Sequence, residues 1–262
     1  MTNYILIDGS YYCFYRYYAI KSWFRNAHKD IELDNPIDNE IFVEKYKKTF
    51  VSKIKELSKK LKIKDPKIIV GKDCKRKKIW RMDLYNKYKE NRDKDDSFMG
   101  GPFIKMAYDD DLFKNAGVEK ILYNKKLEAD DCLAIYSNYL MEKDPNCNVV
   151  IITSDTDYLQ LIKPNIKIIN LKFKEVATSK NSTGIPEKDL FIKIVMGDKS
   201  DDIPSIFSKC GRKTAIKCWD NKDFFNKKME EQKVKLRFDL NKKLIDFKSI
   251  PKKYVKELKS SF

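Results

Sequence analysis

Residues 149–157 read Val-Val-Ile-Ile-Thr-Ser-Asp-Thr-Asp, a short β-branched apolar run that ends in two carboxylates. A run of this length, bounded by polar residues, predicts a strand that is buried on both faces. Similar runs at 4–7, 67–70 and 166–169 alternate with a longer helical pattern at 42–61. This alternation predicts an α/β fold with a mainly parallel central sheet flanked by helices.

Acidic residues follow these runs at the points where the strands would end. Asp8 follows the first run directly, Asp73 lies just beyond the second, and Asp155 and Asp157 close the third. Ligands of such sheets gather outside the carboxyl ends of the strands, so we expect these four side chains at one crevice. For Asp155 and Asp157, an ordinary Asx-rich turn is the alternative.

A further acidic group, Glu128, Asp130 and Asp131, begins the helical pattern at 129–141. Helix capping and the helix dipole are the ordinary explanation for acids at this place. The apolar stripe of this helix would bury one of its sides and leave the acidic turn at the rim of the sheet. There the turn could join the other carboxylates, together with those of 198–202.

Such a collection of carboxylates indicates a site for divalent metal ions. Closely spaced carboxylates raise one another's pKa unless a cation neutralises them, and Mg²⁺ prefers oxygen ligands. Two such ions, roughly 3.5 to 4 Å apart, could activate water and stabilise the leaving oxygen in phosphodiester hydrolysis. The chain has no Gly-x-x-x-x-Gly-Lys loop, and Asp8 lacks the second aspartate of an Asp-x-Asp motif, which argues against a P-loop NTPase or a phosphatase.

The acids belong to a strongly basic chain of 262 residues, with 55 Lys and Arg against 39 Asp and Glu, a net charge of +16. This balance favours a polyanionic partner, with a solvated lysine-rich surface as the alternative. The six cysteines have no Cys-x-x-Cys spacing and there is one histidine, so we expect reduced thiols and no zinc site. No apolar segment approaches the roughly 20 residues that span a bilayer, so we expect a soluble, intracellular protein without membrane contact.

Residues 72–92 carry nine cations interleaved with three aromatic side chains. Cations can hold phosphates while aromatic rings stack on frayed or single-stranded bases. We expect Trp80 and Tyr85 in the core instead. Lys89 and Arg92 share a helical face beside Tyr88, and we place this segment against the scissile phosphate.

As a set, these motifs resemble the flap endonuclease and 5′ to 3′ exonuclease superfamily of structure-specific 5′-nucleases. The resemblance is particularly to the small stand-alone virus and phage type that is often called RNase H. The resemblance covers roughly residues 4–218 in the order that the family has. Its motifs lie at 6–10, 73, 80–81, 88–92, 128–131, 154–157 and 197–204.

The resemblance implies a PIN-like nuclease core with two Mg²⁺ ions, for which Mn²⁺ could substitute. The expected ligands are Asp8, Asp73, Glu128, Asp130 and Asp131 for one ion, and Asp155, Asp157, Asp198 and Asp201 for the other. Lys89 and Arg92 would act on the scissile phosphate as the catalytic pair. Tyr88 would stack on a terminal base, and Arg81 would contact nucleic acid.

The resemblance also implies a helical arch at about 85–110, with 93–110 as its mobile region, and a helix-hairpin-helix element at 203–215 that grips duplex phosphates. The expected duplex contacts are Lys209, Gly211, Arg212, Lys213, Thr214 and Lys217. Ser205 and Asp202 depart from the family's residues, and the turn at 207–209 is one residue longer. These departures leave a bound K⁺ ion open.

The sequence thus predicts a structure-specific 5′-nuclease that acts on 5′ ends, flaps or RNA primers on duplex DNA, in replication or repair. We expect a nuclease core at 1–180, and a duplex-binding region with a tail, packed on the core, at 181–262. We expect a monomer, with a replication polymerase, a clamp or a single-strand binding protein as candidate partners. Two alternatives remain: a PIN-like single-strand ribonuclease, which would not need 211–215, and a non-catalytic DNA-binding module.

Overall fold

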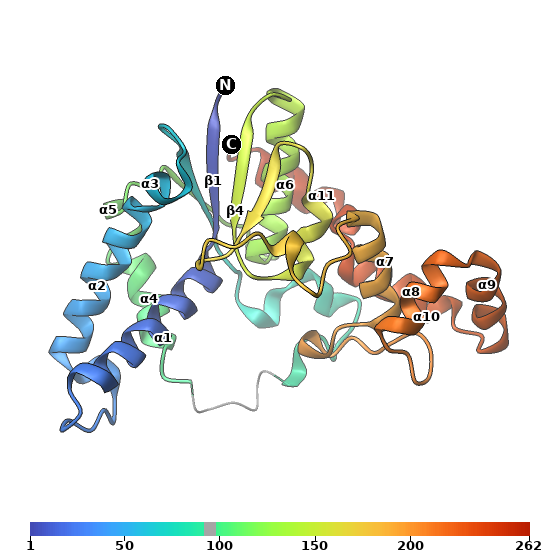
Figure 1. Cartoon of the computed structure of the whole chain (residues 1–262), viewed down its shortest axis with the longest axis horizontal. Coiled ribbons are helices and arrows are strands. Elements are labelled where there is room, and N and C mark those ends of the chain that lie inside the picture. The colour runs from blue at the N-terminus through green and yellow to red at the C-terminus, as the bar shows by residue number, and fades with distance from the viewer. Residues whose placement is uncertain (92–97) are drawn as a thin grey trace.

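The computed structural model describes residues 1–91 and 98–262, and its centre is one parallel sheet (Figure 1). Within the described residues the sheet has five strands in the order β3-β2-β1-β4-β5. The strands are β1 Asn3–Asp8, β2 Lys67–Gly71, β3 Lys120–Leu122, β4 Asn148–Ile152 and β5 Ile166–Ile169. Every pair is parallel, which confirms the predicted sheet and its four predicted strands. The edge strand β3 was not predicted, because three residues are too few to show a period.

The register of the central strands brings their carboxyl ends to one edge of the sheet. Ile7 of β1 pairs with Val70 of β2 and with Ile152 of β4, and Asp8 pairs with Gly71. The polar residues that follow each strand must therefore start from neighbouring points. This alignment is the physical basis of the predicted crevice.

Successive residues of β1 face opposite sides of the sheet and enter two separate cores. Ile5 and Ile7 pack in one core with a first layer of helices, whereas Leu6 packs in the other with the helix Ala129–Lys143 and the end of the chain. The helices of the first layer are α1 Gly9–Ala27, α2 Glu40–Lys55, α3 Leu57–Leu61, α4 Gly101–Asp109 and α5 Leu112–Asn115. The sheet is thus covered on both faces, as its apolar strands require.

Helix α4 occupies the downstream part of the predicted arch at about 85–110. Residues 92–97 of that stretch lie outside the described residues. Phe103 and Ala107 of α4 are fully buried in the first core. They pack there beside α2, the start of which is capped by Asn39. The downstream part of the predicted mobile region 93–110 is therefore a packed helix, because its apolar stripe matches the core.

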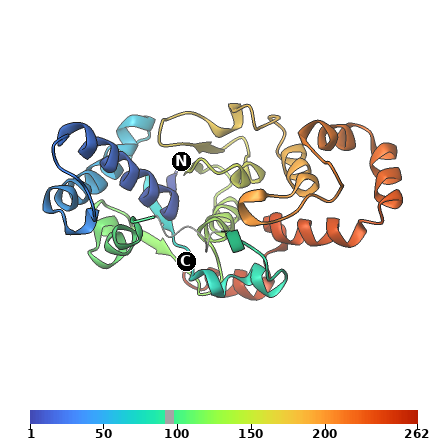
Figure 2. The same cartoon turned by 90° about the horizontal axis from the view of Figure 1, so that it is seen from below.

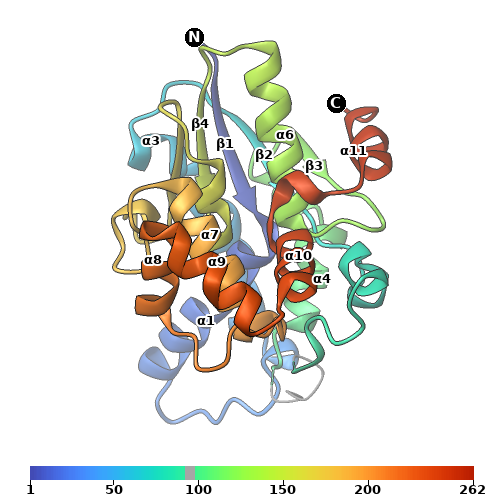
Figure 3. The ribbon, with the colours of Figure 1, turned by 90° about the vertical axis from the view of Figure 1, so that its right-hand side faces the viewer.

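The remaining helices form the second layer and a lobe beside it (Figures 2 and 3). They are α6 Ala129–Lys143, α7 Pro186–Met196, α8 Arg212–Asp220, α9 Lys222–Glu231, α10 Lys235–Ile245 and α11 Lys252–Lys259. Short 3₁₀ helices cover Pro36–Asp38, Arg76–Lys78, Trp80–Asp83, Thr156–Leu161, Val176–Thr178, Lys199–Asp201 and Phe247–Ser249. None of the helices found among the described residues is long and apolar enough to cross a membrane.

The lobe has its own small core, which joins α7, α8 and α9 through residues such as Val195 and Phe207. The lysine-rich tail then returns to the sheet, where Leu258 of α11 is buried beside α6. The Phe262 ring meets the Tyr136 ring edge-on at 4.8 Å. The predicted domain boundary near residue 180 stays a prediction. The last helix, α11, belongs to the predicted second domain but packs on α6 of the first.

Gly71 supplies a test of how closely α6 must approach the end of β2. A Cβ atom at Gly71 would lie 2.6 Å from the Ala129 carbonyl oxygen and 2.8 Å from Leu133 Cγ. We therefore expect Gly71→Ala to lower the free energy of unfolding by about 1–3 kcal/mol through overpacking. The measurement is denaturant unfolding. The control is Gly211→Ala, where a Cβ meets nothing within 4 Å, and equal stability of the two variants would contradict the close approach.

Candidate active site

A cleft of about 420 Å³ lies at the carboxyl edge of the sheet and is lined by eight of the nine predicted metal ligands. These eight are Asp8, Asp73, Glu128, Asp130, Asp155, Asp157, Asp198 and Asp201. The Lys89 side chain lines the same cleft. The structure thus brings together side chains that are almost two hundred residues apart in sequence, as the sheet topology predicts.

Two carboxylates at strand ends are held by the starts of helices, Asp8 by α1 and Asp73 by α1 and α6. Asp8 caps α1, where one carboxylate oxygen accepts the Tyr11 N–H at 3.0 Å and the other accepts the Tyr158 hydroxyl at 3.1 Å. Asp73 accepts the Ala129 N–H at 2.7 Å and the Ser10 hydroxyl. Each carboxylate keeps a fixed direction toward the cleft, because its bonds come from backbone or buried groups.

Burial and mutual repulsion change the protonation of these acids. Burial, and then the neighbouring Asp73, raise the pKa of Asp8 to about 7. Burial also raises the pKa of Asp73, and burial together with Asp131 and Glu128 raises the pKa of Asp130 well above its ordinary value. A raised pKa means that the ionised form is unfavourable without a neutralising cation.

Arg81 is buried and holds the acidic turn at the start of α6. Its guanidinium is 2% exposed and makes a two-pronged contact with Asp131, Nη1 to Oδ2 and Nη2 to Oδ1, both at 2.8 Å. It also donates to Glu128 at 3.0 Å and to the Leu244 carbonyl at 2.7 Å. These four hydrogen bonds and its burial give Arg81 a supporting role inside the protein, and its contact with nucleic acid stays a prediction.

Asp131 is held in place by several donors inside the protein. It is fully buried, and beyond the Arg81 contacts it accepts the Trp80 indole N–H at 2.9 Å and the Glu128 backbone N–H at 3.2 Å. A metal ion would have to displace these donors. The helix-capping explanation therefore applies to Asp131. Its place among the metal ligands stays a prediction, since one of its oxygens lies close to oxygens of Glu128 and Asp130. Trp80 is buried as expected.

Tyr88 is buried inside the protein, whereas the Lys89 side chain lines the cleft. Tyr88 is 3% exposed, and its hydroxyl donates to Glu128 at 2.9 Å or to Asp201 at 3.0 Å. The Tyr88 ring is thus inside the protein when no nucleic acid is bound, and its stacking on a terminal base stays a prediction. The Lys89 ammonium contacts Glu128 and lies 3.7 Å from Asp201 Oδ2. Arg92 lies outside the described residues.

The charge balance at Glu128 reflects these contacts. Burial alone would raise its pKa, but Lys89 and Arg81 outweigh burial and keep the pKa below its ordinary value. Lys89 has a left-handed backbone with φ of 58°, which is uncommon for a residue with a side chain. Its N–H donates to the Asp201 carbonyl at 3.0 Å, and this contact joins the basic segment to the second acidic group.

Lys193 is a site residue that the sequence analysis missed. On the last turn of α7, its ammonium contacts Asp157 and lies 2.7 Å from Asp198 Oδ2. Burial opposes ionisation of Asp198, but Lys193 lowers its pKa to about 2. The available signal was one lysine inside the apolar pattern Phe-Ile-Lys-Ile-Val-Met, residues 191–196.

Asp155 both caps a 3₁₀ helix and lines the cleft. One of its oxygens accepts the Asp157 N–H at 2.9 Å, so it caps the 3₁₀ helix Thr156–Leu161 as the turn alternative predicts. Its carboxylate is exposed and also lines the cleft. The two explanations therefore do not exclude each other.

Two carboxylate groups are compact enough to hold metal ions. One ligand oxygen from each of Glu128, Asp130 and Asp131 lies within 4.8 Å of the others, and the same holds for Asp157, Asp198 and Asp201. The donors are all hard oxygens, which fits Mg²⁺ or Mn²⁺. In the metal-free protein Asp131 accepts hydrogen bonds from Arg81 and Trp80. Asp8 and Asp73 line the same cleft as Glu128 and Asp130.

The predicted duplex contacts lie at the start of α8, away from the cleft. Gly211 precedes the helix in an extended conformation, and Lys209, Gly211, Lys213 and Lys217 are exposed. Arg212 and Thr214 are half-buried, and Arg212 lies 4.0 Å from Asp189. Exposed cations around a helix start can bind phosphates.

The sequence is similar to known 5′-nucleases. The family model described as 5′-3′ exonuclease, N-terminal resolvase-like domain, matches residues 3–190. The 5′-3′ exonuclease of Bacillus subtilis (strain 168) is 30% identical over 151 residues, which make up 53% of this chain and 47% of that protein. The 5′-3′ exonuclease of Buchnera aphidicola subsp. Acyrthosiphon pisum is 30% identical over 216 residues, 81% of this chain and 68% of that protein. The chain thus spans about half of the first relative and about two thirds of the second.

A solved structure shares the fold. The bacteriophage T5 flap endonuclease, in a pseudo-enzyme-product complex with DNA and metal ions, aligns with a TM-score of 0.66. The alignment covers 99% of this chain and 97% of that chain at 16% sequence identity. This likeness confirms the predicted PIN-like fold.

The contact between Arg81 and Asp131 gives a stability prediction. Arg81→Ala leaves a buried carboxylate without its partner, so we expect the free energy of unfolding to fall by about 3–5 kcal/mol. Lys126→Ala, which removes an exposed ion pair with Asp83, should cost at most about 1 kcal/mol. Denaturant unfolding of both variants measures this difference, and a similar small loss in both would contradict the anchoring role.

The raised pKa of Asp8 gives a pH prediction. Between its ordinary value of 3.8 and about 7, the folded protein keeps a proton that the unfolded chain releases. Metal-free stability should therefore fall as pH rises through this range. We expect Asp8→Asn to raise the melting temperature of the metal-free protein at pH 8, and to reduce the further rise on adding Mg²⁺.

The control for this pH prediction is Asp34→Asn, which changes an exposed carboxylate and should leave both melting temperatures unchanged. If Asp8→Asn instead lowers metal-free stability at pH 8, the hydrogen bonds that Asp8 accepts stabilise the fold more than its burial and repulsion destabilise it.

Proposed function

We propose, from the premise that this chain belongs to the 5′-3′ exonuclease family, that it is a structure-specific 5′-nuclease. It hydrolyses phosphodiesters at 5′ ends, flaps or RNA primers on duplex DNA, in replication or repair. The observation that carries this proposal is the single cleft in which eight carboxylates and Lys89 meet. That composition suits metal-assisted hydrolysis of a phosphodiester, and needs no histidine.

The carboxylates would hold two divalent cations, with Mg²⁺ as the first choice and Mn²⁺ as a substitute. The first ion would be bound by Asp8, Asp73, Glu128, Asp130 and Asp131, and the second by Asp155, Asp157, Asp198 and Asp201. When bound, the ions would activate a water molecule and stabilise the leaving oxygen. Asp131 would orient the first group through its contacts with Arg81.

Lys89 would act on the scissile phosphate. Its ammonium lies in the cleft and, in the protein alone, neutralises Glu128. When cations occupy the carboxylates, this ammonium can instead donate to a phosphate oxygen, where it offsets the charge that grows in the transition state. Arg92 stays the predicted second member of the pair.

Lys193 would position the second acidic group. By contacting both Asp157 and Asp198 it keeps two like charges close together before a metal ion binds. It thereby lowers the cost of assembling the site, because the opposite charge favours the ionised carboxylates.

The lobe beside the sheet would grip duplex DNA. The exposed cations at the start of α8 and its N-terminal amides suit phosphate oxygens. Asp202, where the family usually has asparagine, accepts the Asn91 N–H at 2.7 Å. It thus ties 89–91 to the lobe, and a K⁺ ion is not needed to explain its place. A replication polymerase, a clamp or a single-strand binding protein would be partners in this role.

The nuclease proposal predicts that Asp155→Asn abolishes cleavage of a 5′-flap duplex. The exposed carboxylate would be lost as a ligand, whereas the amide can still accept the Asp157 N–H and keep the fold. DNA affinity, measured by fluorescence anisotropy in EDTA, should change by less than about twofold, since α8 is untouched. The control is Asp144→Asn at the far end of α6. Normal turnover by Asp155→Asn would remove Asp155 from the site.

The role of Lys89 predicts a difference between chemistry and binding. Lys89→Ala should lower the single-turnover cleavage rate by about 100-fold or more, while DNA affinity changes much less. Lys87→Ala removes an exposed cation two residues away and should leave the cleavage rate nearly unchanged. If Lys89→Ala loses binding and rate equally, Lys89 acts outside the chemical step.

A further inference from the structure

We propose that the outward face of α1 is a track for single-stranded nucleic acid, which leads from the active-site cleft to a groove at the far end of the helix. The inference rests on the proposed nuclease function and adds a substrate feature to it, namely a 5′ single strand of several nucleotides. It is carried by the side chains of α1, by the lining of the groove and by their charges.

The track begins at the cleft with aromatic side chains. Phe14 lines the acidic cleft, is 39% exposed and stacks on the Phe98 ring at 4.6 Å. Tyr18, one helical turn further, is 53% exposed and has its ring 6.1 Å from that of Phe98. Exposed aromatic rings beside a basic surface are platforms on which bases of any sequence can stack.

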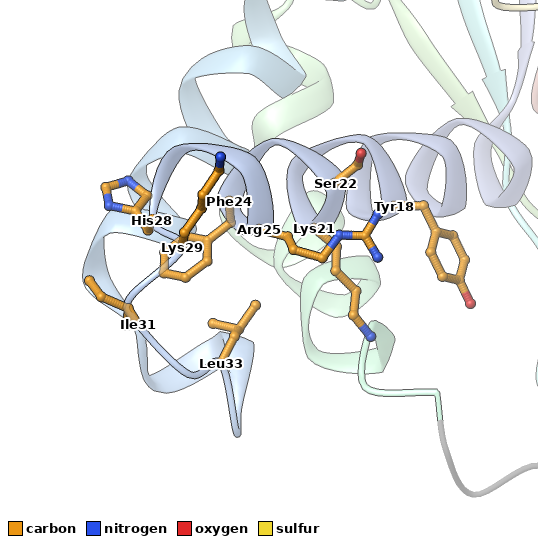
Figure 4. A pocket seen from close by; sticks show the side chains of 9 residues that line it. All are labelled: Tyr18, Lys21, Ser22, Phe24, Arg25, His28, Lys29, Ile31 and Leu33. Carbon is orange, nitrogen blue, oxygen red and sulfur yellow. The ribbon is translucent and has the colours of Figure 1, made fainter.

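The track continues with cations on the same side of the helix. Lys21 and Arg25 follow Tyr18 at spacings of three and four residues, which places all three on one face. Figure 4 shows Tyr18, Lys21 and Arg25 in this order along α1. A strand that stacks on Tyr18 would thus meet cations for its phosphates next.

The far end of the track is a groove of about 480 Å³ between α1 and the segment that follows it. Its lining includes the apolar Phe24 and Leu33 and the cations Lys21, Arg25 and Lys29. Among the described residues that line the groove, none is an aspartate or a glutamate. Asp30 and the other acids of the segment after α1 are not part of the lining.

The charge of this face is uncompensated. In the part of the chain that the structure describes, none of Lys21, Arg25 and Lys29 forms an ion pair. The 19 residues of α1 contain no aspartate or glutamate. An ordinary solvated helix face would mix both signs, as α9 does with Lys227 and Glu231. The surface therefore complements a polyanion.

The aromatic end favours nucleic acid over an acidic peptide as the occupant. Phe14 is shared between the track and the cleft in which phosphodiesters would be hydrolysed. A strand held at the cleft is therefore already placed at the start of the track. An acidic peptide could bind the cations of the groove, but it has no bases to stack on Phe14 and Tyr18.

The length of α1 sets the length of strand that the track can hold. Its 19 residues span about 28 Å, which a stacked strand covers with about eight nucleotides at about 3.4 Å each. A single unpaired nucleotide at the cleft cannot reach Lys21 or Arg25. Flap length therefore separates the track from the active site.

The first test measures binding without catalysis. A labelled oligothymidylate of about twelve nucleotides, long enough to cover the track, is titrated in EDTA at several salt concentrations. For the double variant Lys21→Ala/Arg25→Ala we expect the log–log salt slope to fall by about 1.4, the value for two lost single-strand phosphate contacts. Lys59→Ala/Lys60→Ala, which removes two exposed cations of α3, is the matched control and should keep the wild-type slope.

The second test measures cleavage of two duplexes, with flaps of one nucleotide and of about twelve nucleotides, the latter long enough for the track. The Lys21→Ala/Arg25→Ala variant should raise KM for the long flap about tenfold and leave the short flap unchanged. Tyr18→Ala should also raise KM for the long flap about tenfold, and Tyr18→Phe should restore it, because stacking needs the ring and not the hydroxyl.

Three outcomes would overturn the track. The first is a salt slope of the Lys21→Ala/Arg25→Ala variant equal to that of the control variant, and the second is an equal rise in KM for short and long flaps. The third is an oligonucleotide that an acidic peptide displaces but flap DNA and RNA do not. If the wild-type protein cleaves neither duplex, the nuclease function fails instead. The binding slope in EDTA then still decides whether α1 holds a single strand.

Discussion

The carboxylates that meet at one edge of the sheet repel one another, and much of the structure serves to keep them together. The parallel register places Asp8 beside Gly71, so that the residues after β1 and β2 start side by side. Buried and half-buried cations then offset part of the charge: Arg81 behind the first group, Lys193 within the second, and Lys89 beside Glu128. The raised pKa values of Asp8, Asp73 and Asp130 show that this compensation is incomplete. The remaining charge is what divalent cations would neutralise.

Cooperation between distant parts of the chain follows from the same constraint. The first acidic group depends on α6 and on the segment around Arg81, and the Leu244 carbonyl in α10 accepts the Arg81 Nε–H. The second group depends on α7, which carries Lys193. The C-terminal helices are therefore part of the active-site support, although they contribute no ligand. On the other side, α1 starts from the Asp8 cap and carries exposed aromatic and basic side chains away from the cleft.

The sequence predicts the features that local pattern determines. Apolar β-branched runs predict four strands, and acids directly after them predict the cleft, because a parallel sheet has one carboxyl edge. Pattern does not reveal which polar residue is buried by a partner far away in the chain. The sequence does not show that Arg81 is bonded to Asp131, or that the Tyr88 hydroxyl donates to Glu128. Lys193 was not predicted as a site residue, because it is a single cation within a mainly apolar stretch of α7. β3 was too short to show a period.

The most direct test of the central claim is cleavage of an end-labelled 5′-flap duplex, beside matched single-stranded RNA and blunt duplex, each with Mg²⁺ or with EDTA. If the carboxylates hold cations that hydrolyse phosphodiesters at 5′ ends, the flap duplex is cut near its junction with Mg²⁺ and is intact in EDTA. Cutting of single-stranded RNA alone would contradict the structure-specific activity and favour a PIN-like ribonuclease. Binding of the duplex without any product would contradict hydrolysis itself.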